Sequence, residues 1–133
     1  MKKKLLLLLT AALLALGLVA CGKASTLEDF YSKPLYTEAM DSQIASYEET
    51  YASTYSDIDW SVSDNTLTYS YTYAVQVEDV NALKSSLDAN LTNEAVAPSI
   101  TDLEEETGIT GVSIQYIYYN NDGTEIYNKT FSN

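Results

Sequence analysis

The sequence lacks histidine and arginine altogether, and it has a single cysteine, Cys21. Histidine is the commonest general base near neutral pH, and arginine is the side chain that grips phosphates and carboxylates with paired hydrogen bonds. Without them, catalysis would depend on carboxylates, lysine, serine, threonine and tyrosine. One cysteine also excludes an intrachain disulfide, so packing alone must stabilise the fold. We expect no metal site, no cofactor and no catalytic residue.

Positive charge is scarce as well. The chain has seven lysines against 19 carboxylates, a formal net charge of −12. Three of the lysines are Lys2, Lys3 and Lys4, and without them four lysines face the same 19 carboxylates, a formal charge of −15. Such a chain is repelled by nucleic acid and by anionic lipid. The acidity serves either solubility or docking of a basic partner or cations.

The amino terminus has the pattern of a secretory signal. An apolar run without charge, from Leu5 to Ala20, follows the three lysines. This run is shorter than the about 20 residues that span a bilayer, and it ends on small residues. The residues LVAC, which end at Cys21, resemble the bacterial lipobox, in which the cysteine is acylated and the chain is cleaved just before it. The alternative is an uncleaved anchor helix, which would also tether the chain to a membrane.

Three segments follow from this pattern. We expect a signal peptide over residues 1–20 with cleavage between Ala20 and Cys21, a lipidated cysteine with a short tether over residues 21–25, and a single domain over residues 26–133. The length after cleavage fits one domain with a modest core. The location implied is the extracytoplasmic face of a cell membrane, reached through a lipid anchor.

Helical patterns occur twice in this domain. A capping box, Ser25 with Glu28 or Thr26 with Asp29, opens a short helix before Pro34. A long amphipathic helix then follows, with apolar residues at helical spacing. These apolar residues are Tyr36, Met40, Ile44, Tyr47, Tyr51 and Tyr55.

The second helical region starts after Glu78-Asp79. Its apolar residues are Val80, Leu83, Leu87 and Leu91. A further helix is expected from about Pro98 to Gly108, because glycine suits the left-handed position after a helix. The acidic run Glu104-Glu105-Glu106 in its last turn opposes the helix dipole.

Two hairpins complete the pattern. The segment from Ile58 to Val77 alternates apolar and polar residues around the turn Asp64-Asn65, which places Trp60 opposite Tyr69 and makes the tyrosines of TLTYSYTY face the core. A second hairpin spans Val112 to Phe131 around an Asp-Gly turn. The fold class expected is α+β: a two-layer sandwich with a four-stranded, mainly antiparallel sheet and helices on one face. Patterning leaves the strand order open.

The same parity defines a candidate binding patch. On the side opposite the core, the second hairpin carries Ile117, Tyr119 and Ile126 among polar neighbours. These residues form either a binding patch or a surface that another part of the chain or a second copy covers. Carboxylates such as Asp57 and Asp59 could serve a hydrolase only if they lined a cleft.

The lipobox, TLEDFY, NTLTYSYTY and GVSIQYIYYNNDGTEIYNKTF together resemble a domain-of-unknown-function family found in small lipoproteins of Gram-positive bacteria. The resemblance covers nearly all of the chain after the leader, and it implies an extracytoplasmic lipoprotein without assigning an activity or site residues. The first hypothesis is therefore a membrane-tethered binding module for a protein, peptide or envelope polymer. The alternatives are a carboxylate-dependent hydrolase of envelope polymers and a passive surface or structural protein.

The lipid anchor gives the first testable prediction. Replacing the only thiol, Cys21→Ala, should abolish acyl labelling and release the protein from membranes, because the sulfur is the attachment atom. Metabolic labelling with a fatty-acid analogue and membrane fractionation measure both effects. Labelling that persists in the variant would contradict lipidation at this residue.

Overall fold

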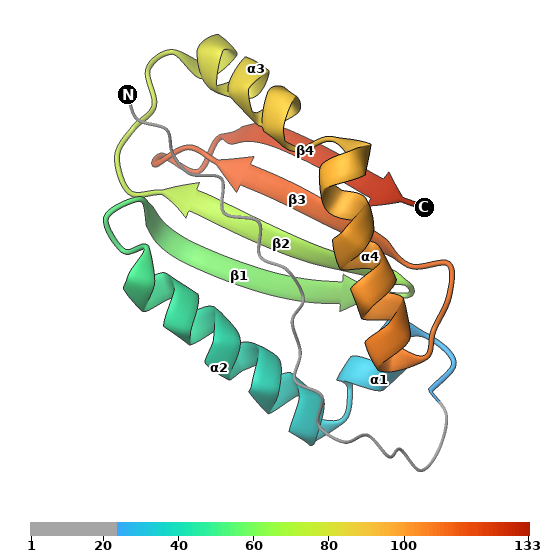
Figure 1. The fold of residues 1–133 in the computed structure, drawn as a ribbon. Helices are drawn as coiled ribbons and strands as arrows, with labels where there is room; N and C mark the ends of the chain where they lie inside the picture. Colours follow the sequence, from blue (N-terminus) through green and yellow to red (C-terminus); the bar gives the residue numbers. More distant parts are fainter. Residues whose placement is uncertain (1–23) are drawn as a thin grey trace.

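Four strands form one sheet in the order β1-β2-β3-β4, and four helices cover one face of it (Figure 1). The computed structural model describes residues 24–133, so the expected signal peptide and Cys21 lie outside the described residues. The helices are α1 (Leu27–Tyr31), α2 (Pro34–Thr50), α3 (Val80–Asn90) and α4 (Asn93–Thr107). The strands are β1 (Tyr55–Ser63), β2 (Thr66–Tyr73), β3 (Ser113–Tyr119) and β4 (Glu125–Ser132). None of the helices in this range is long and apolar enough to span a membrane.

The two hairpins, β1-β2 and β3-β4, join through a parallel pairing of β2 with β3. A parallel neighbour requires a crossover connection, and α3 with α4 provides it. The expected α+β class with a mainly antiparallel sheet is confirmed, and the strand order is now defined.

Local capping fixes the starts and ends of the helices. The Thr26 hydroxyl accepts a hydrogen bond from the Asp29 amide at 3.0 Å, which decides between the two possible capping pairs for α1. The Asp79 side chain caps α3, and the Thr92 hydroxyl caps α4. Gly108, with φ of 76°, ends α4 in the left-handed conformation that glycine adopts without strain.

Three expected boundaries are wrong. The helix from Pro34 ends at Thr50, and Tyr55 begins β1, because the amide of Tyr55 closes a turn on the Tyr51 carbonyl. The tyrosine spacing therefore continues past the end of the helix. The last helix begins at Asn93 rather than at Pro98, since the Thr92 hydroxyl caps it and Pro98 lies inside it.

The strand expected to run to Val77 also ends early, at Tyr73. Beyond this point the loop between β3 and β4 captures the chain. The Asn121 side chain donates to the carbonyls of Tyr73 and Ala74 at 3.1 and 3.0 Å, and the buried Asn120 side chain exchanges two hydrogen bonds with the main chain of Val77. These contacts replace the sheet pairing that would have continued β2.

The register of the first hairpin is confirmed. Ser63 pairs with Thr66 across the turn Asp64-Asn65, and Trp60 therefore pairs with Tyr69. The tyrosines of β2 face the helices, as expected from parity. Tyr71 and Tyr69 are 0% and 1% exposed, so they form the floor of the core rather than a displayed row.

Stacked tyrosines from neighbouring strands fill the centre of the core. The parallel register pairs Tyr69 with Tyr116 and Tyr71 with Tyr118. Their rings stack with centroids 5.9 Å and 4.6 Å apart. Aromatic pairs at such distances add about 0.5–1.5 kcal/mol beyond the burial of their area. The parallel contact thus stabilises the join between the two hairpins.

Four tyrosines of the core each bury a hydroxyl that has no partner within residues 24–133. The hydroxyls concerned are those of Tyr31, Tyr71, Tyr116 and Tyr118. Burial raises the pKa of Tyr71 and Tyr118 well above the ordinary value, so both hydroxyls stay neutral. An unpaired buried polar group costs about 1–3 kcal/mol. These tyrosines therefore stabilise the fold through the packing of their rings, whereas their unpaired hydroxyls lower its stability.

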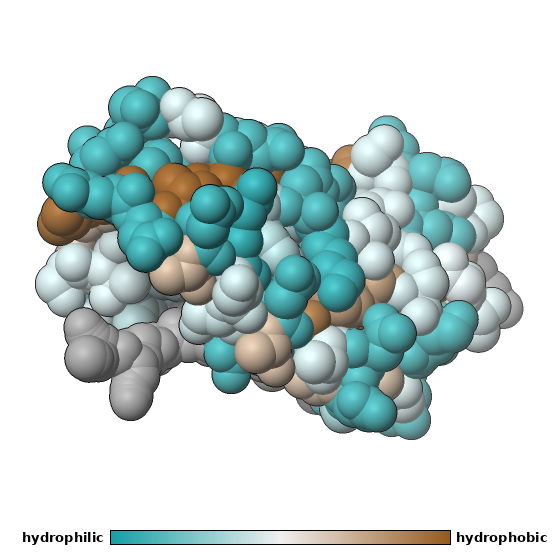
Figure 2. All heavy atoms as spheres, turned by 90° about the horizontal axis from the view of Figure 1, so that it is seen from above, coloured by the Kyte–Doolittle hydropathy of each residue, from teal (hydrophilic) through white to brown (hydrophobic). Residues whose placement is uncertain are grey.

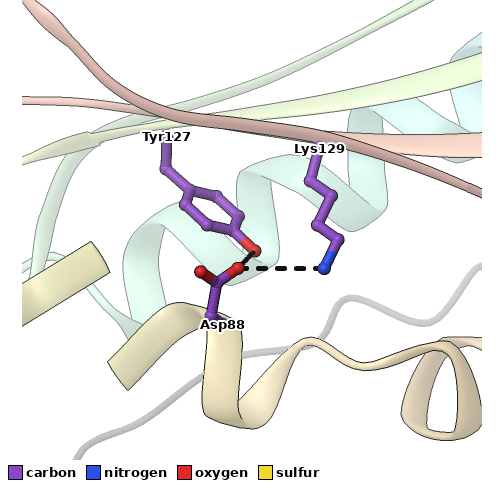
Figure 3. A network of polar contacts seen from close by, with 3 residues as sticks. All are labelled: Asp88, Tyr127 and Lys129. Atoms are coloured by element: carbon purple, nitrogen blue, oxygen red, sulfur yellow. Dashed lines mark hydrogen bonds and ion pairs between the residues drawn. The ribbon is translucent and has the colours of Figure 1, made fainter. Parts of the chain in front are cut away.

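The hydroxyl of Tyr127 is different, because it has a partner. It donates a hydrogen bond of 2.9 Å to Asp88 on α3 (Figure 3). The Lys129 ammonium lies 3.8 Å from the same carboxylate oxygen and 5.2 Å from the centroid of the Phe131 ring. This contact fastens α3 to β4.

The contrast between these hydroxyls gives a paired prediction. Tyr71→Phe removes an unpartnered hydroxyl, so the free energy of unfolding should stay the same or rise by up to about 1 kcal/mol. Tyr127→Phe removes the bond to Asp88 and should lower it by about 1 kcal/mol, a value reduced by the solvent exposure of that carboxylate. Urea denaturation measures both values. A larger loss for Tyr71→Phe than for Tyr127→Phe would contradict this assignment.

The buried tyrosines also predict loss of stability in alkali. Burial raises the pKa of Tyr73 to about 12, and it also raises the pKa of Tyr71 and Tyr118 well above the ordinary value. An unfolded chain releases these protons near pH 10. Their contribution to stability is therefore complete below about pH 10 and falls as pH rises above it. The part of the tyrosinate absorbance that comes from the buried tyrosines should rise only together with the loss of circular dichroism, and ionisation of all twelve tyrosines in a protein that stays folded would contradict this.

Candidate functional site

The face of the sheet opposite the helices, called here the open face, carries a different set of side chains. The registers of the three strand pairs align its residues in four rows that cross the sheet. From one end to the other, the rows are Asp57–Thr72–Tyr119–Glu125, Asp59–Ser70–Ile117–Asn128, Ser61–Thr68–Gln115–Thr130 and Ser63–Thr66–Ser113–Ser132.

All of these residues reach solvent. Those on the central strands β2 and β3 are partly exposed, and those on the edge strands β1 and β4 are exposed. The helices contact the sheet from the other side, where the buried residues of every strand lie. The open face is therefore a broad surface that the described part of the chain leaves uncovered.

Hydrogen bonds between side chains hold part of this surface in place. The Thr68 hydroxyl donates to the Gln115 oxygen at 2.8 Å, and the Gln115 amide donates to the Asn128 oxygen at 2.7 Å. At the end of the face, the hydroxyls of Ser113 and Ser132 lie 2.6 Å apart. Such pairing fixes the direction of the remaining donors and acceptors, which reduces the entropy that a ligand's binding would cost.

The expected apolar patch is only partly present. Ile117 and Tyr119 lie in adjacent rows of the open face, and both are partly exposed. Ile126 is 4% exposed and belongs to the core, so its assignment to the patch is wrong. The reason is a shift in register after Tyr118, which places Glu125 instead of Ile126 opposite Tyr119. Alternation alone cannot anticipate this bulge.

Three carboxylates, and no lysine, lie on the open face. Asp57 and Asp59 stand on β1, and Glu125 stands on β4. Desolvation, followed by the neighbouring charges of Glu48 and Asp59, raises the pKa of Asp57. A positive group placed beside these carboxylates would relieve their repulsion.

These acids give the hydrolase hypothesis no further support. Asp57 and Asp59 stand side by side on one strand, and both are exposed. Hydrolysis by paired acids requires two carboxyl groups on either side of the bond to be broken. Glu48, the nearest acid from α2, accepts a hydrogen bond from the Ile58 amide at 3.2 Å and thus has a structural role.

The acidic end of α4 has a structural explanation as well. Glu104 turns back to accept hydrogen bonds from the amides of Gly111 and Val112 at 2.8 and 3.3 Å, which fixes the loop before β3. Desolvation, followed by the charge of Asp102, raises the pKa of Glu106 to about 7. Within residues 24–133, no three acidic side chains are grouped as metal ligands.

The segment NNDG between β3 and β4 is also a structural element. Besides the contacts of Asn120 and Asn121 described above, Gln76 and Asp122 hydrogen-bond each other through a side-chain contact of 3.3 Å and a main-chain contact of 3.1 Å. The loop thus fastens the segment after β2 to the second hairpin. The sequence signal was the pair of asparagines, which a simple Asp-Gly hairpin turn does not need.

The sheet order and one polar face place this protein in the class of two-layer α+β domains, with a sheet surface that residues 24–133 leave uncovered. A family model described as Domain of unknown function (DUF4854) matches residues 27–131, and the chain belongs to this family. No curated protein and no solved structure matches the chain.

Proposed function

We propose that this protein is a lipoprotein anchored through Cys21 to the extracytoplasmic face of a cell membrane, and that its open face binds a partner that carries positive charge. The partner is a protein, a peptide or an envelope polymer with amino groups. The anchor is supported by the leader pattern and by the lipobox ending at Cys21.

One observation carries the binding proposal. The sheet exposes a complete face whose rows hold hydroxyl, amide and carboxylate groups but no positive charge. Without the three lysines of the signal, the formal charge of −15 attracts cations over the whole molecule. The partly exposed Tyr119 and Ile117 add an apolar contact in the two rows that hold the carboxylates. A polymer or peptide with amino groups and apolar parts would match both features.

The domain is held close to its anchor. Only residues 22–25 separate Cys21 from the capping residue Thr26, so the tether spans little more than about 15 Å. A module at this distance would meet partners in the layer next to the membrane. This placement favours envelope components and neighbouring membrane proteins over distant targets.

A ligand panel tests the proposal on the full chain in nonionic detergent. The probes are oligolysine and an oligomer of glucosamine. The control for oligolysine is the anionic oligoglutamate, and the control for the glucosamine oligomer is its uncharged N-acetylated form. The cationic probes should raise the melting temperature, because they bind only the folded face. Added salt should reduce the effect, since the attraction is screened.

Two variants assign the effect to the open face. Asp57→Asn combined with Asp59→Asn and Tyr119→Ser should abolish the shift. The control, Glu38→Gln combined with Glu105→Gln, removes the same charge from exposed positions on α2 and α4 and should keep it. Equal losses in both variants would show that the shift depends on the net charge of the protein and not on the open face. No shift with any probe would favour the passive surface protein.

A further inference from the structure

The two edges of the sheet are treated differently by the rest of the chain. In β1, the two-residue turn makes Ser63 and Thr66 a hydrogen-bonded pair, and alternation from there turns the main-chain groups of Ile58, Trp60 and Val62 outward. Carboxylates accept hydrogen bonds from two of these three amides. Glu48 accepts from Ile58 at 3.2 Å, and Asp59 accepts from Trp60 at 2.9 Å.

The outward groups of β4 follow from the same reasoning. The amide of Ser113 donates to the Asn65 carbonyl on the side of β2. Alternation along β3 then turns Ile114, Tyr116 and Tyr118 toward β4, where they pair with Phe131, Lys129 and Tyr127. The residues left to point outward from β4 are Asn128, Thr130 and Ser132.

This second edge is open. Asn128, Thr130 and Ser132 are exposed, and no hydrogen bond from another described residue reaches their amides. Natural sheets commonly protect such an edge, often with a lysine. Here Lys129 is held over the helix side of the sheet by Asp88 and Phe131, so it does not cross the edge (Figure 3).

The side of the molecule seen from above α3 is mostly hydrophilic, with small apolar areas between the polar side chains (Figure 2). A partner at this side would therefore bind mainly through hydrogen bonds and charge. Two acids flank β4: Asp88 on the helix side, which is already paired with Lys129 and Tyr127, and Glu125 on the open face, which is exposed and has no lysine in its row. An added strand would present alternate side chains to these two sides.

We propose that the edge of β4 accepts an extended peptide with lysine at alternate positions as an additional strand. Its main chain would pair with the outward groups of Asn128, Thr130 and Ser132. Its lysines, which all lie on one side because they alternate, would point to the open face near Glu125. This inference rests on the proposed function and makes it more specific, because it names a peptide as the cationic partner and β4 as the place where it docks.

The experiment uses the full chain, labelled with ¹⁵N, in nonionic detergent. The probe is a peptide of alternating lysine and valine, and its matched control replaces each lysine by glutamate. Binding of the lysine peptide should protect the amides of Asn128, Thr130 and Ser132 from hydrogen exchange at least about tenfold, whereas the glutamate peptide should leave them unchanged. Ile58 and Trp60 on the opposite edge should not change with either peptide.

A proline variant at each edge supplies the second measurement. Thr130→Pro removes an outward amide without removing a bond inside the sheet, so it should weaken binding of the lysine peptide by at least about tenfold. Val62→Pro makes the same change at the outer edge of β1 and should leave the affinity unchanged. Far-ultraviolet circular dichroism verifies that each variant is folded, and the exchange data on the unaltered chain are independent of both.

The outcomes separate this inference from the proposed function. Protection of the three β4 amides by the lysine peptide supports both. Peptide binding that perturbs Asp57, Asp59 and Tyr119 but not the β4 amides overturns the added strand and leaves the cationic open face in place. If the β4 amides become protected without peptide as the protein concentration rises, the edge pairs with a second copy of the chain. That result overturns the proposal that a peptide docks there. An absence of peptide binding overturns the added strand, whereas the proposed function is overturned only if oligolysine and the glucosamine oligomer also fail to bind.

Discussion

The parallel pairing of β2 with β3 is the contact on which the rest of this structure depends. It joins two hairpins that are far apart in the chain, and its register stacks Tyr71 on Tyr118 and Tyr69 on Tyr116. The same register aligns the polar residues of all four strands into the rows of the open face. One pairing therefore determines both the packing of the core and the continuity of the surface to which we assign binding.

The core achieves this packing with an unusual choice of residue. Phenylalanine would fill much the same space without burying a hydroxyl, yet Tyr71, Tyr116 and Tyr118 each bury a hydroxyl that no described residue pairs. The stabilisation from ring stacking and area burial must exceed that cost. Polar contacts with clear partners lie instead at the periphery, in the Tyr127–Asp88–Lys129 contact and in the loop of Asn120 and Asn121.

Patterning predicted the fold class, the register of the first hairpin and the residues that face the helices. Its failures have identifiable causes. Tyr55 continues the helical spacing of α2 although the helix has ended, because spacing cannot reveal a turn stabilised by main-chain bonds. Strand β2 stops at Tyr73 because a distant loop captures the following residues. Ile126 is buried because a bulge changes the alternation of β4, so the candidate patch contains Ile117 and Tyr119 but not Ile126.

The sequence by itself determined the acidic charge, the absence of histidine and arginine, the basic and apolar run before Cys21 and the alternation of each strand. These properties depend on composition or on neighbours along the chain. Only the tertiary structure decided which strands are central, that the polar residues form one continuous face and that the two edges differ. These properties depend on pairings between distant segments, whose register arises from the packing of both hairpins and the helices together.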